Sequence, residues 1–302
     1  KKNMKKIKKI MVPASSANLG SGFDSIGLCL DLWNEIQFHQ SKFKISISGE
    51  GTETINKDKN NLIYQSYLKT SEILNTQGID LSINCINSIP TSGGLGSSSS
   101  AVIAGIMIAF SINQIDIEKN KIYQIASQIE GHPDNVGPAI FGGITIGFKD
   151  KNNWHINQIP FPKDLKIVSF VSKQKVLTDD SRKKLPDNIS RKDAVYNISR
   201  VATLVNSLNN SHYNELKYSV QDAIHEQYRI NSIKGFKLIS DAAKNAGALA
   251  TYLSGSGPTI SAITNNKEVT INYEMLEAAS RLNIDGKGFI NNVSYKGAHI
   301  IE

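Results

Sequence analysis

The segment 90–101, Pro-Thr-Ser-Gly-Gly-Leu-Gly-Ser-Ser-Ser-Ser-Ala, has the composition of a loop that binds phosphate. Its three glycines let the backbone turn tightly and bring N–H groups close to a ligand. Its serines open an apolar run, 101–110, that suits a buried helix. Because the N-terminus of a helix combines unpaired N–H donors with the positive end of the helix dipole, it stabilises an anion. The segment therefore predicts a phosphate site in which a serine hydroxyl is available to Mg²⁺.

A flexible linker is the alternative interpretation of residues 90–101, since glycine and serine are also typical of linkers. The position of the segment favours the phosphate site, because strand-like residues 83–89 precede it and the apolar run follows directly. Two common nucleotide motifs are excluded. No Lys follows the last glycine, as a Walker A loop requires, and no third glycine completes a dinucleotide-binding fingerprint.

Two further segments concentrate groups that could bind a small polar substrate. Residues 14–24 form a loop of small residues in which Asn18 precedes Asp24 by six positions. Residues 130–137 place two carboxylates, an imidazole and an amide at the end of a predicted helix. Asn and Asp are also common turn formers, so surface turns are the alternative for both segments. A second glycine loop, 254–258, separates two strand-like runs.

The hydrophobic pattern predicts the elements that must position these segments. We expect strands at 9–13, 26–32, 35–38, 42–48, 83–89, 165–171, 249–253 and 259–263, with a strand pair inside 139–148. We expect helices at 60–75, 101–110, 117–129, 192–208, 211–223, 236–246 and 272–282. Asn60 and Asn61 supply an N-cap, and Gly247 a left-handed C-cap. Because residues 151–162 are polar and lack periodicity, we expect two domains, 1–158 and 159–302.

Composition and charge exclude several classes of protein. The net charge is +7, but six lysines fall in the first nine residues and the remainder is nearly neutral. We therefore expect a solvated basic tail rather than a surface that binds nucleic acid. No apolar run approaches the roughly 18 residues that span a bilayer. The two cysteines, Cys29 and Cys85, fit buried thiols in a reducing cytoplasm, where we expect the protein to reside.

Taken together, the segments 13–20, 90–100 and 254–258 resemble the three motifs of the GHMP kinases, in the same order and over nearly the whole chain. Within that family, 22–27 and 132–136 are most similar to the branch that phosphorylates L-homoserine. The resemblance implies an α+β fold. Its N-terminal ATP-binding domain is ribosomal protein S5 domain 2-like, with a left-handed crossover, and its C-terminal domain is ferredoxin-like. It also implies ATP, Mg²⁺ and small-molecule substrates, threonine biosynthesis as the pathway, and a homodimer.

The resemblance also implies roles for individual residues around a small zwitterion. Asn18 and Asp24 hold its ammonium group, and Arg182 and Arg229 hold its carboxylate, a task that suits the guanidinium fork. Thr178 and His132 complete that pocket, and Asn135 lies near the reacting hydroxyl. The residues expected in catalysis are Asn135, Asp24 and His132. Because phosphoryl transfer depends on positioning more than on a strong base, we expect direct attack by the hydroxyl on the γ-phosphate.

The nucleotide is expected along the glycine-serine loop, with adenine near residues 60–64. The ATP-binding residues are predicted to be Pro90, Thr91, Ser92, Gly93, Gly94, Leu95, Gly96, Ser97, Ser98, Ser99, Ser100, Asn61, Ser256 and Gly257. Ser98, with Ser97 as the competing choice, and Glu130 are expected to hold the metal ion. Surface ion pairs are the alternative for the two arginines, and a solvated helix end is the alternative for Glu130.

Two other functions remain open at this point. One is a different GHMP small-molecule kinase, of the mevalonate type, which does not need two arginines together with an acidic partner for an ammonium group. The other is a regulatory protein of the same fold without catalysis, against which the intact glycines and serines of the phosphate loop argue. The sequence departs modestly from the family pattern, with four serines in that loop and Gly20-Ser21-Gly22 in the first motif.

Overall fold

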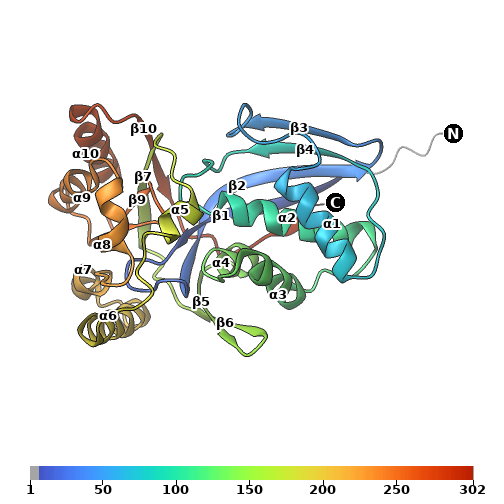
Figure 1. The fold of residues 1–302 in the computed structure, drawn as a ribbon. Helices are drawn as coiled ribbons and strands as arrows, with labels where there is room; N and C mark the ends of the chain where they lie inside the picture. Colours follow the sequence, from blue (N-terminus) through green and yellow to red (C-terminus); the bar gives the residue numbers. More distant parts are fainter. Residues whose placement is uncertain (1–6, 302) are drawn as a thin grey trace.

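The computed structural model contains two β-sheets (Figure 1). It describes residues 7–301, apart from the side chains of residues 178 and 179. The larger sheet contains β1 (Lys8–Ala17), β2 (Ile26–Gln40), β3 (Lys44–Gly49), β4 (Leu81–Asn87), β5 (Ile144–Asp150), β6 (Asn153–Ile159) and β11 (His299–Ile301). Its strand order is β11-β1-β2-β4-β3, and β5 pairs with both β2 and β6. All pairs are antiparallel except β3 with β4, which α1 (Leu62–Ile73) connects.

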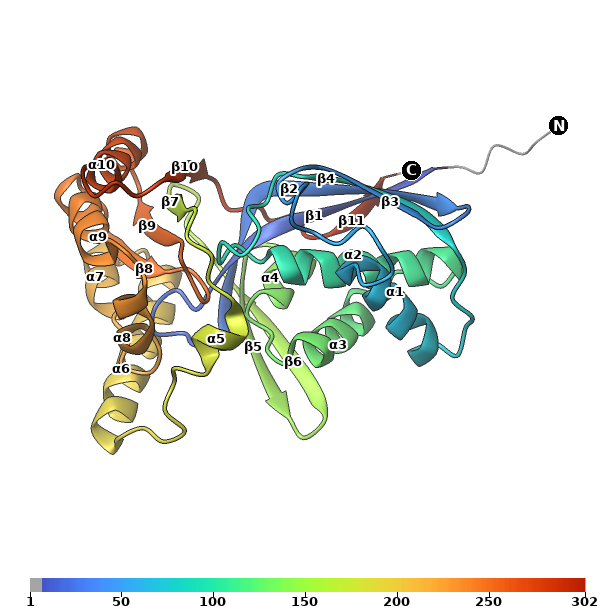
Figure 2. The same ribbon diagram turned by 45° about the horizontal axis from the view of Figure 1, so that its top comes forward.

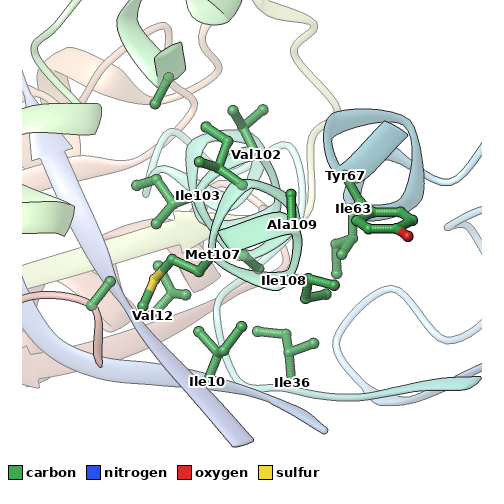
Figure 3. Packing of buried hydrophobic residues seen from close by; sticks show 14 of the residues in the cluster. Ile10, Val12, Ile36, Ile63, Tyr67, Val102, Ile103, Met107, Ile108 and Ala109 are labelled. Atoms are coloured by element: carbon green, nitrogen blue, oxygen red, sulfur yellow. The ribbon is translucent and has the colours of Figure 1, made fainter. Parts of the chain in front are cut away.

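Helices cover one face of the larger sheet (Figure 2). They are α1, α2 (Ser97–Ile112), α3 (Lys119–Glu130) and α4 (Val136–Phe141). The central helix, α2, is buried at every position from Val102 to Ser111, as a helix that is apolar on all sides must be. Figure 3 shows its side chains between Ile10 and Ile36 of the sheet and Ile63 of α1. This core fixes the start of α2 relative to the end of β1.

The smaller sheet has the order β10-β7-β9-β8. Its strands are β7 (Lys166–Ser172), β8 (Ala250–Leu253), β9 (Ile260–Thr264) and β10 (Gly286–Asn291). Helices α9 (Phe236–Asn245) and α10 (Glu268–Arg281) pack on this sheet through a core that includes Phe170, Ile239 and Met275. A third cluster of buried residues, including Leu28, Leu95 and Leu204, joins the sheets.

Four further helices follow β7 in the chain, and the longest of them has 19 residues. They are α5 (Thr178–Arg182), α6 (Arg191–Asn209), α7 (Leu216–Ser219) and α8 (Glu226–Arg229), with single 3₁₀ turns at Tyr213–Glu215 and Ile230–Ser232. The predicted boundary at 158 falls where β6 ends, but β11 returns to pair with β1 in the larger sheet. No helix among residues 7–301 combines the length and apolar character needed to cross a bilayer.

Several predicted elements are wrong in detail. The strand pair expected inside 139–148 is instead helix α4 followed by β5. The partner of β5 is β6, which lies within the polar stretch 151–162. That edge strand does alternate, with Trp154 and Ile156 on its better-covered face. The two strands expected in 26–38 are one strand, β2, and the helix expected at 211–223 is only a 3₁₀ turn and α7.

Other corrections concern the ends of elements. Of the predicted pair Asn60 and Asn61, it is Asn61 that caps α1, with its Oδ1 accepting the N–H of Ile63. The cap predicted at Gly247 is confirmed: its φ is 108°, its N–H donates to the carbonyl oxygen of Lys244, and the N–H of Ala248 donates to that of Ala243. Lys8 is not part of a solvated tail, since it begins β1 and its Nζ lies 3.0 Å from Ser111 Oγ. Residues 1–6 of that expected tail lie outside the described residues. The cysteines are free and buried, as predicted.

Candidate active site

The predicted phosphate loop connects β4 to α2. Gly94 and Gly96 have φ angles of 78° and 72°, a left-handed conformation that glycine adopts without strain. A Cβ on Gly96 would lie 2.1 Å from Ser15 Oγ, so only glycine lets β1 approach here. The N-cap of α2 is Gly96, which has no side chain that could cap the helix. The N–H groups of its first turn, 97–99, are therefore available to an anion.

The second glycine loop, 254–258, packs against the phosphate loop. Ser254 Oγ donates a hydrogen bond of 2.7 Å to the carbonyl oxygen of Gly94, and Thr259 Oγ1 donates to that of Gly93. A Cβ on Gly94 would lie 2.3 Å from the carbonyl oxygen of Ser254. The two loops thus meet backbone to backbone, each from one of the two sheets.

The carboxylate of Glu130, the last residue of α3, faces the serines that open α2. Ser98 Oγ donates to Glu130 Oε1 at 3.1 Å, and Ser99 Oγ donates to Oε2 at 2.6 Å. The structure therefore brings together the predicted pair, Ser98 and Glu130, and adds Ser99. Hydroxyl and carboxylate oxygens are the ligands that Mg²⁺ prefers, so these residues fit that ion.

An ion pair joins the first motif to the short helix α5. Both oxygens of the Asp24 carboxylate accept hydrogen bonds from the Arg182 guanidinium, at 2.7 and 2.8 Å. The side chains keep 31% and 40% of their surface exposed, so a polar ligand can reach both. A bidentate pair of this kind has fixed geometry as well as favourable energy.

His132 and Asp134 lie beside that ion pair. His132 Nδ1 is 2.6 Å from Asp134 Oδ1, and ligand-type atoms of Asp24, His132 and Asp134 all lie within 4.8 Å of one another. Burial would lower the pKa of His132, but the nearby carboxylates, above all Asp134, outweigh burial and raise it. The imidazole is thereby biased toward its protonated, hydrogen-donating form.

Asn135 stands between the phosphate loop and these charged side chains. Its Oδ1 accepts a hydrogen bond of 2.9 Å from Ser15 Oγ and would lie 3.2 Å from a Cβ on Gly96. Its backbone N–H donates to Asp134 Oδ1 at 3.1 Å. The phosphate loop and the charged side chains therefore belong to one continuous site, with Asn135 at the junction.

The side chain of Asn18 holds the backbone of Asp24 in place. Its Oδ1 accepts the backbone N–H of Asp24 at 3.0 Å, and its Nδ2 donates to the carbonyl oxygen of Gly255 at 3.1 Å. Because the residue is only 2% exposed, its side chain serves mainly to tie the first motif to the second glycine loop.

The second predicted arginine, Arg229, is buried at the end of α8. Its guanidinium lies over the ring of Phe23 at 5.2 Å, and that of Arg182 lies 5.7 Å from the same ring. Burial, followed by the charge of Arg182, lowers the pKa of Arg229. One aromatic ring therefore contacts both guanidinium groups that the sequence predicted to act together.

A narrow, mainly apolar slot lies at the start of α2, where the adenine was expected. Its lining includes Ile47, Ile55, Leu62 and Ser97. Asn61 also lines the slot, although its amide caps α1 and donates to the carbonyl oxygen of Asn56 at 2.7 Å. Ser97, the competing choice for the metal ion, thus faces this slot, whereas Ser98 and Ser99 reach Glu130.

Two further predicted residues, Thr178 and Ser256, belong to α5 and to the second glycine loop. Thr178 begins α5, but its side chain lies outside the described residues. Ser256 sits in the second glycine loop, and its carbonyl oxygen accepts a hydrogen bond from Ser181. Four residues of the site received no individual role from the sequence: Ser15, Phe23, Asp134 and His225. The first three lie inside the recognised segments, and His225 precedes Arg229 by four positions, which is the spacing of helix neighbours.

Two family models match this chain. The model of the GHMP kinases N terminal domain matches residues 61–143, and that of the GHMP kinases C terminal domain matches residues 194–272. Together with the full-length relatives described next, these matches show that the chain belongs to the GHMP kinase family. The fold predicted for both domains is confirmed.

Relatives that align over most of their length narrow the family further. A homoserine kinase of Carboxydothermus hydrogenoformans is 34% identical over 95% of this chain and 98% of its own. Another, of Caldanaerobacter subterraneus subsp. tengcongensis, is 39% identical over 85% of this chain and 83% of its own. The crystal structure of homoserine kinase from Cytophaga hutchinsonii covers 100% of this chain and 99% of that one, with a TM-score of 0.87 and 28% identity. A mevalonate kinase structure, at a TM-score of 0.68 and 17% identity over 95% of this chain and 99% of its own, shares the fold.

Proposed function

We propose that this chain is an ATP-dependent kinase that phosphorylates the side-chain hydroxyl of L-homoserine. The products are O-phospho-L-homoserine and ADP, and the step belongs to threonine biosynthesis. The observation that carries the proposal is the Asp24–Arg182 ion pair, which lies with Arg229 next to the phosphate loop. Homoserine is a zwitterion with one reactive hydroxyl, so its binding requires these opposite charges close to a phosphate donor.

The charged side chains match the two ends of the substrate. The ammonium group of homoserine would replace Arg182 as the partner of Asp24, and its carboxylate would bind Arg182 and Arg229. Exchange of one ion pair for two costs little, because each charged group keeps a partner of opposite sign. An alcohol that lacks either the ammonium or the carboxylate group would offer no counter-charge to Asp24 or to the arginines. We therefore expect mevalonate and sugars to be poor substrates.

The nucleotide would bind along the other side of Asn135. The N–H groups at the start of α2 and the glycine loop would contact the phosphates, and the slot at Leu62 would take the base. Ser98 and Glu130, with Ser99, would hold Mg²⁺, which neutralises charge on the phosphates when bound.

The arrangement favours direct transfer without a dedicated base. The substrate hydroxyl oxygen forms a bond to the γ-phosphorus, the bond from that phosphorus to the bridging oxygen breaks, and the hydroxyl proton passes to the transferred group. Asn135 lies beside the phosphate loop, and its amide cannot accept a proton. His132, whose pKa is raised, would donate to the substrate or to a phosphoryl oxygen. Positioning of this kind supplies much of the catalysis in phosphoryl transfer.

The test is an assay of ADP release with ATP and Mg²⁺ against L-homoserine, L-serine, L-threonine, mevalonate and galactose. We expect strong turnover with homoserine alone. Turnover with mevalonate or galactose instead would keep the phosphate loop and discard the amino-acid pocket. ATP binding without turnover of any of the five would favour a regulatory protein of this fold.

A further inference from the structure

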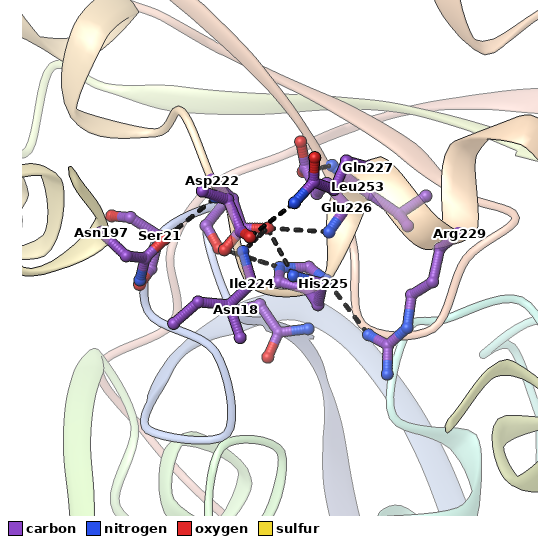
Figure 4. Close-up of polar contacts among 12 residues, drawn as sticks. Asn18, Ser21, Asn197, Asp222, Ile224, His225, Glu226, Gln227, Arg229 and Leu253 are labelled. Carbon is purple, nitrogen blue, oxygen red and sulfur yellow. Dashed lines mark hydrogen bonds and ion pairs between the residues drawn. The ribbon is translucent and has the colours of Figure 1, made fainter. Parts of the chain in front are cut away.

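Arg229 is oriented by a histidine one helical turn before it (Figure 4). The Nη1 group of Arg229 lies 3.1 Å from His225 Nδ1 and donates to the carbonyl oxygen of Gly255 at 3.2 Å. Arg229 is only 2% exposed, so these two acceptors restrict the directions in which its guanidinium can point.

The neighbours of His225 determine which of its nitrogens carries hydrogen. Nε2 lies 2.9 Å from the carbonyl oxygen of Gly20, which can only accept. Nδ1 faces a guanidinium N–H, which can only donate. The ring must therefore be neutral, with hydrogen on Nε2 and a lone pair on Nδ1.

Further contacts fix the backbone and the ring of His225. Asp222 Oδ2 accepts the backbone N–H groups of Ile224, His225 and Glu226 at 2.6 to 3.0 Å, which fixes the start of α8. Phe23 stacks on the imidazole, with ring centroids 4.9 Å apart and an interplanar angle of 19°. Because the same Phe23 ring lies under both arginines, the first motif and α8 share one packed support.

The charges that face His225 act in opposite directions. Burial, the largest effect, and the charge of Arg229 lower its pKa, whereas Asp222, Asp24 and the carbonyl group of Gly20 raise it, and the net direction is downward. Protonation would remove the acceptor of Arg229 Nη1 and place a second positive charge against it. The neutral ring is thus the form compatible with the observed contact.

We propose that His225 is a positioning residue which, as a neutral hydrogen-bond acceptor, aims the Arg229 guanidinium at the substrate carboxylate. This inference rests on the proposed function. It explains why a buried polar ring lies behind the pocket, where it touches Arg229 but is itself completely buried. It predicts that loss of the acceptor impairs binding of the amino-acid substrate and leaves the nucleotide site intact.

The kinetic test compares two His→Phe substitutions. In His225→Phe the ring and its stacking remain but both nitrogens are lost. His155 is the matched control, since it also stacks on a phenylalanine, Phe148, with centroids 5.0 Å apart and an angle of 16°, but lies on β6. We expect His225→Phe to raise KM for homoserine about 10- to 100-fold, the range for a lost hydrogen bond to a charged group. The KM for ATP and kcat should stay within about twofold, and His155→Phe should match the parent protein.

A rise in both KM values, or no rise for homoserine, would overturn the proposal. His225→Gln supplies a second variant, because its amide can accept from Arg229 while donating to Gly20. It should recover most of the affinity lost in His225→Phe. Equal impairment in the two variants would indicate a purely structural role.

A second measurement does not depend on the substrate. The ¹⁵N chemical shifts of the His225 imidazole, assigned by their absence in His225→Gln, should show hydrogen on Nε2 and a bare Nδ1 at pH 7. A ring with hydrogen on Nδ1, or on both nitrogens, would overturn the proposal. If homoserine is not the substrate, this result is unaffected, so failure of the proposed function and failure of the positioning role are distinguishable.

Discussion

The two halves of the site are built in different ways. The phosphate half consists of backbone N–H groups, glycines and small hydroxyl side chains, nearly all of which come from the one segment between β4 and α2. The substrate half consists of charged side chains from four separate places: the loop after β1, the end of α3, α5 and α8. We infer that steric fit controls the first half and that ion pairing controls the second. Substitutions in the two halves should therefore fail in different ways.

The largest effect is expected in the phosphate half. Gly94→Ala places a Cβ 2.3 Å from the carbonyl oxygen of Ser254, so the two glycine loops must separate. We expect kcat/KM to fall at least 100-fold and Tm to fall as well. The matched control is Gly143→Ala, since that glycine also has a positive φ but its nearest neighbour would lie 3.7 Å away. In a denaturation experiment its free energy of unfolding should fall only by the roughly 1–2 kcal/mol that an alanine in a left-handed conformation costs. Equal losses in both variants would contradict the steric account.

Asp24→Asn should give the largest effect in the substrate half. The change removes the negative charge that faces the Arg182 guanidinium and the expected site for the ammonium group. We expect kcat/KM for homoserine to fall about 30- to 100-fold, mostly through KM, while KM for ATP is unchanged. Steady-state kinetics with each substrate varied in turn would measure this. Loss of kcat with intact affinity would instead identify Asp24 as a base and refute direct transfer.

Glu130→Gln probes the proposed metal site beside the phosphate loop. The amide keeps an acceptor for one serine hydroxyl but loses the charge that a divalent cation requires. We expect the Mg²⁺ concentration for half-maximal nucleotide binding to rise about tenfold, measured by fluorescence of a labelled ATP analogue. Glu118→Gln, just before the other end of the same helix, is the control and should have no effect. An unchanged Mg²⁺ requirement in Glu130→Gln would exclude Glu130 as a metal ligand.

The smallest effect concerns the stability of the support under the substrate half. Glu226 opens α8 and accepts the N–H of Leu253 at 2.6 Å, and burial raises its pKa to about 8. In the folded protein the Glu226 carboxyl group therefore stays protonated up to about pH 8, whereas in the unfolded chain it ionises near pH 4.5. Because the folded state binds the proton more tightly, the free energy of unfolding falls as pH rises between these two values.

Glu226→Gln keeps the acceptor for Leu253 and does not titrate. Urea denaturation at pH 5, 7 and 9 should therefore show a smaller decline in stability toward high pH than in the parent protein. Glu72→Gln, an exposed position on α1, is the control and should follow the parent protein. If Glu226→Gln also follows it, the carboxyl group is ionised in the folded state.

The phosphate half was predictable because its chemistry is local. Residues 90–100 contain the turn, the glycines and the helix start within eleven positions, and the observed loop follows that pattern. In the structure Ser99 also contacts Glu130. Sequence spacing alone could not show that Ser99 rather than Ser97 reaches this carboxylate, because the contact depends on how α3 packs against α2. Residues after 282 were not assigned, since β10 contains two glycines and β11 has only three residues.

What the sequence by itself determined is the set of local devices: the glycine-serine loop, the apolar helix α2, the capped helix α1 and the resemblance that linked the motifs. The tertiary structure decided which side chains meet. Arg182 and Asp24, 158 positions apart, pair only because α5 packs beside the first motif, and His225 reaches Gly20 across 205 positions. Local conformation follows from neighbours in the chain, whereas an ion pair or a histidine tautomer depends on groups that folding alone brings together.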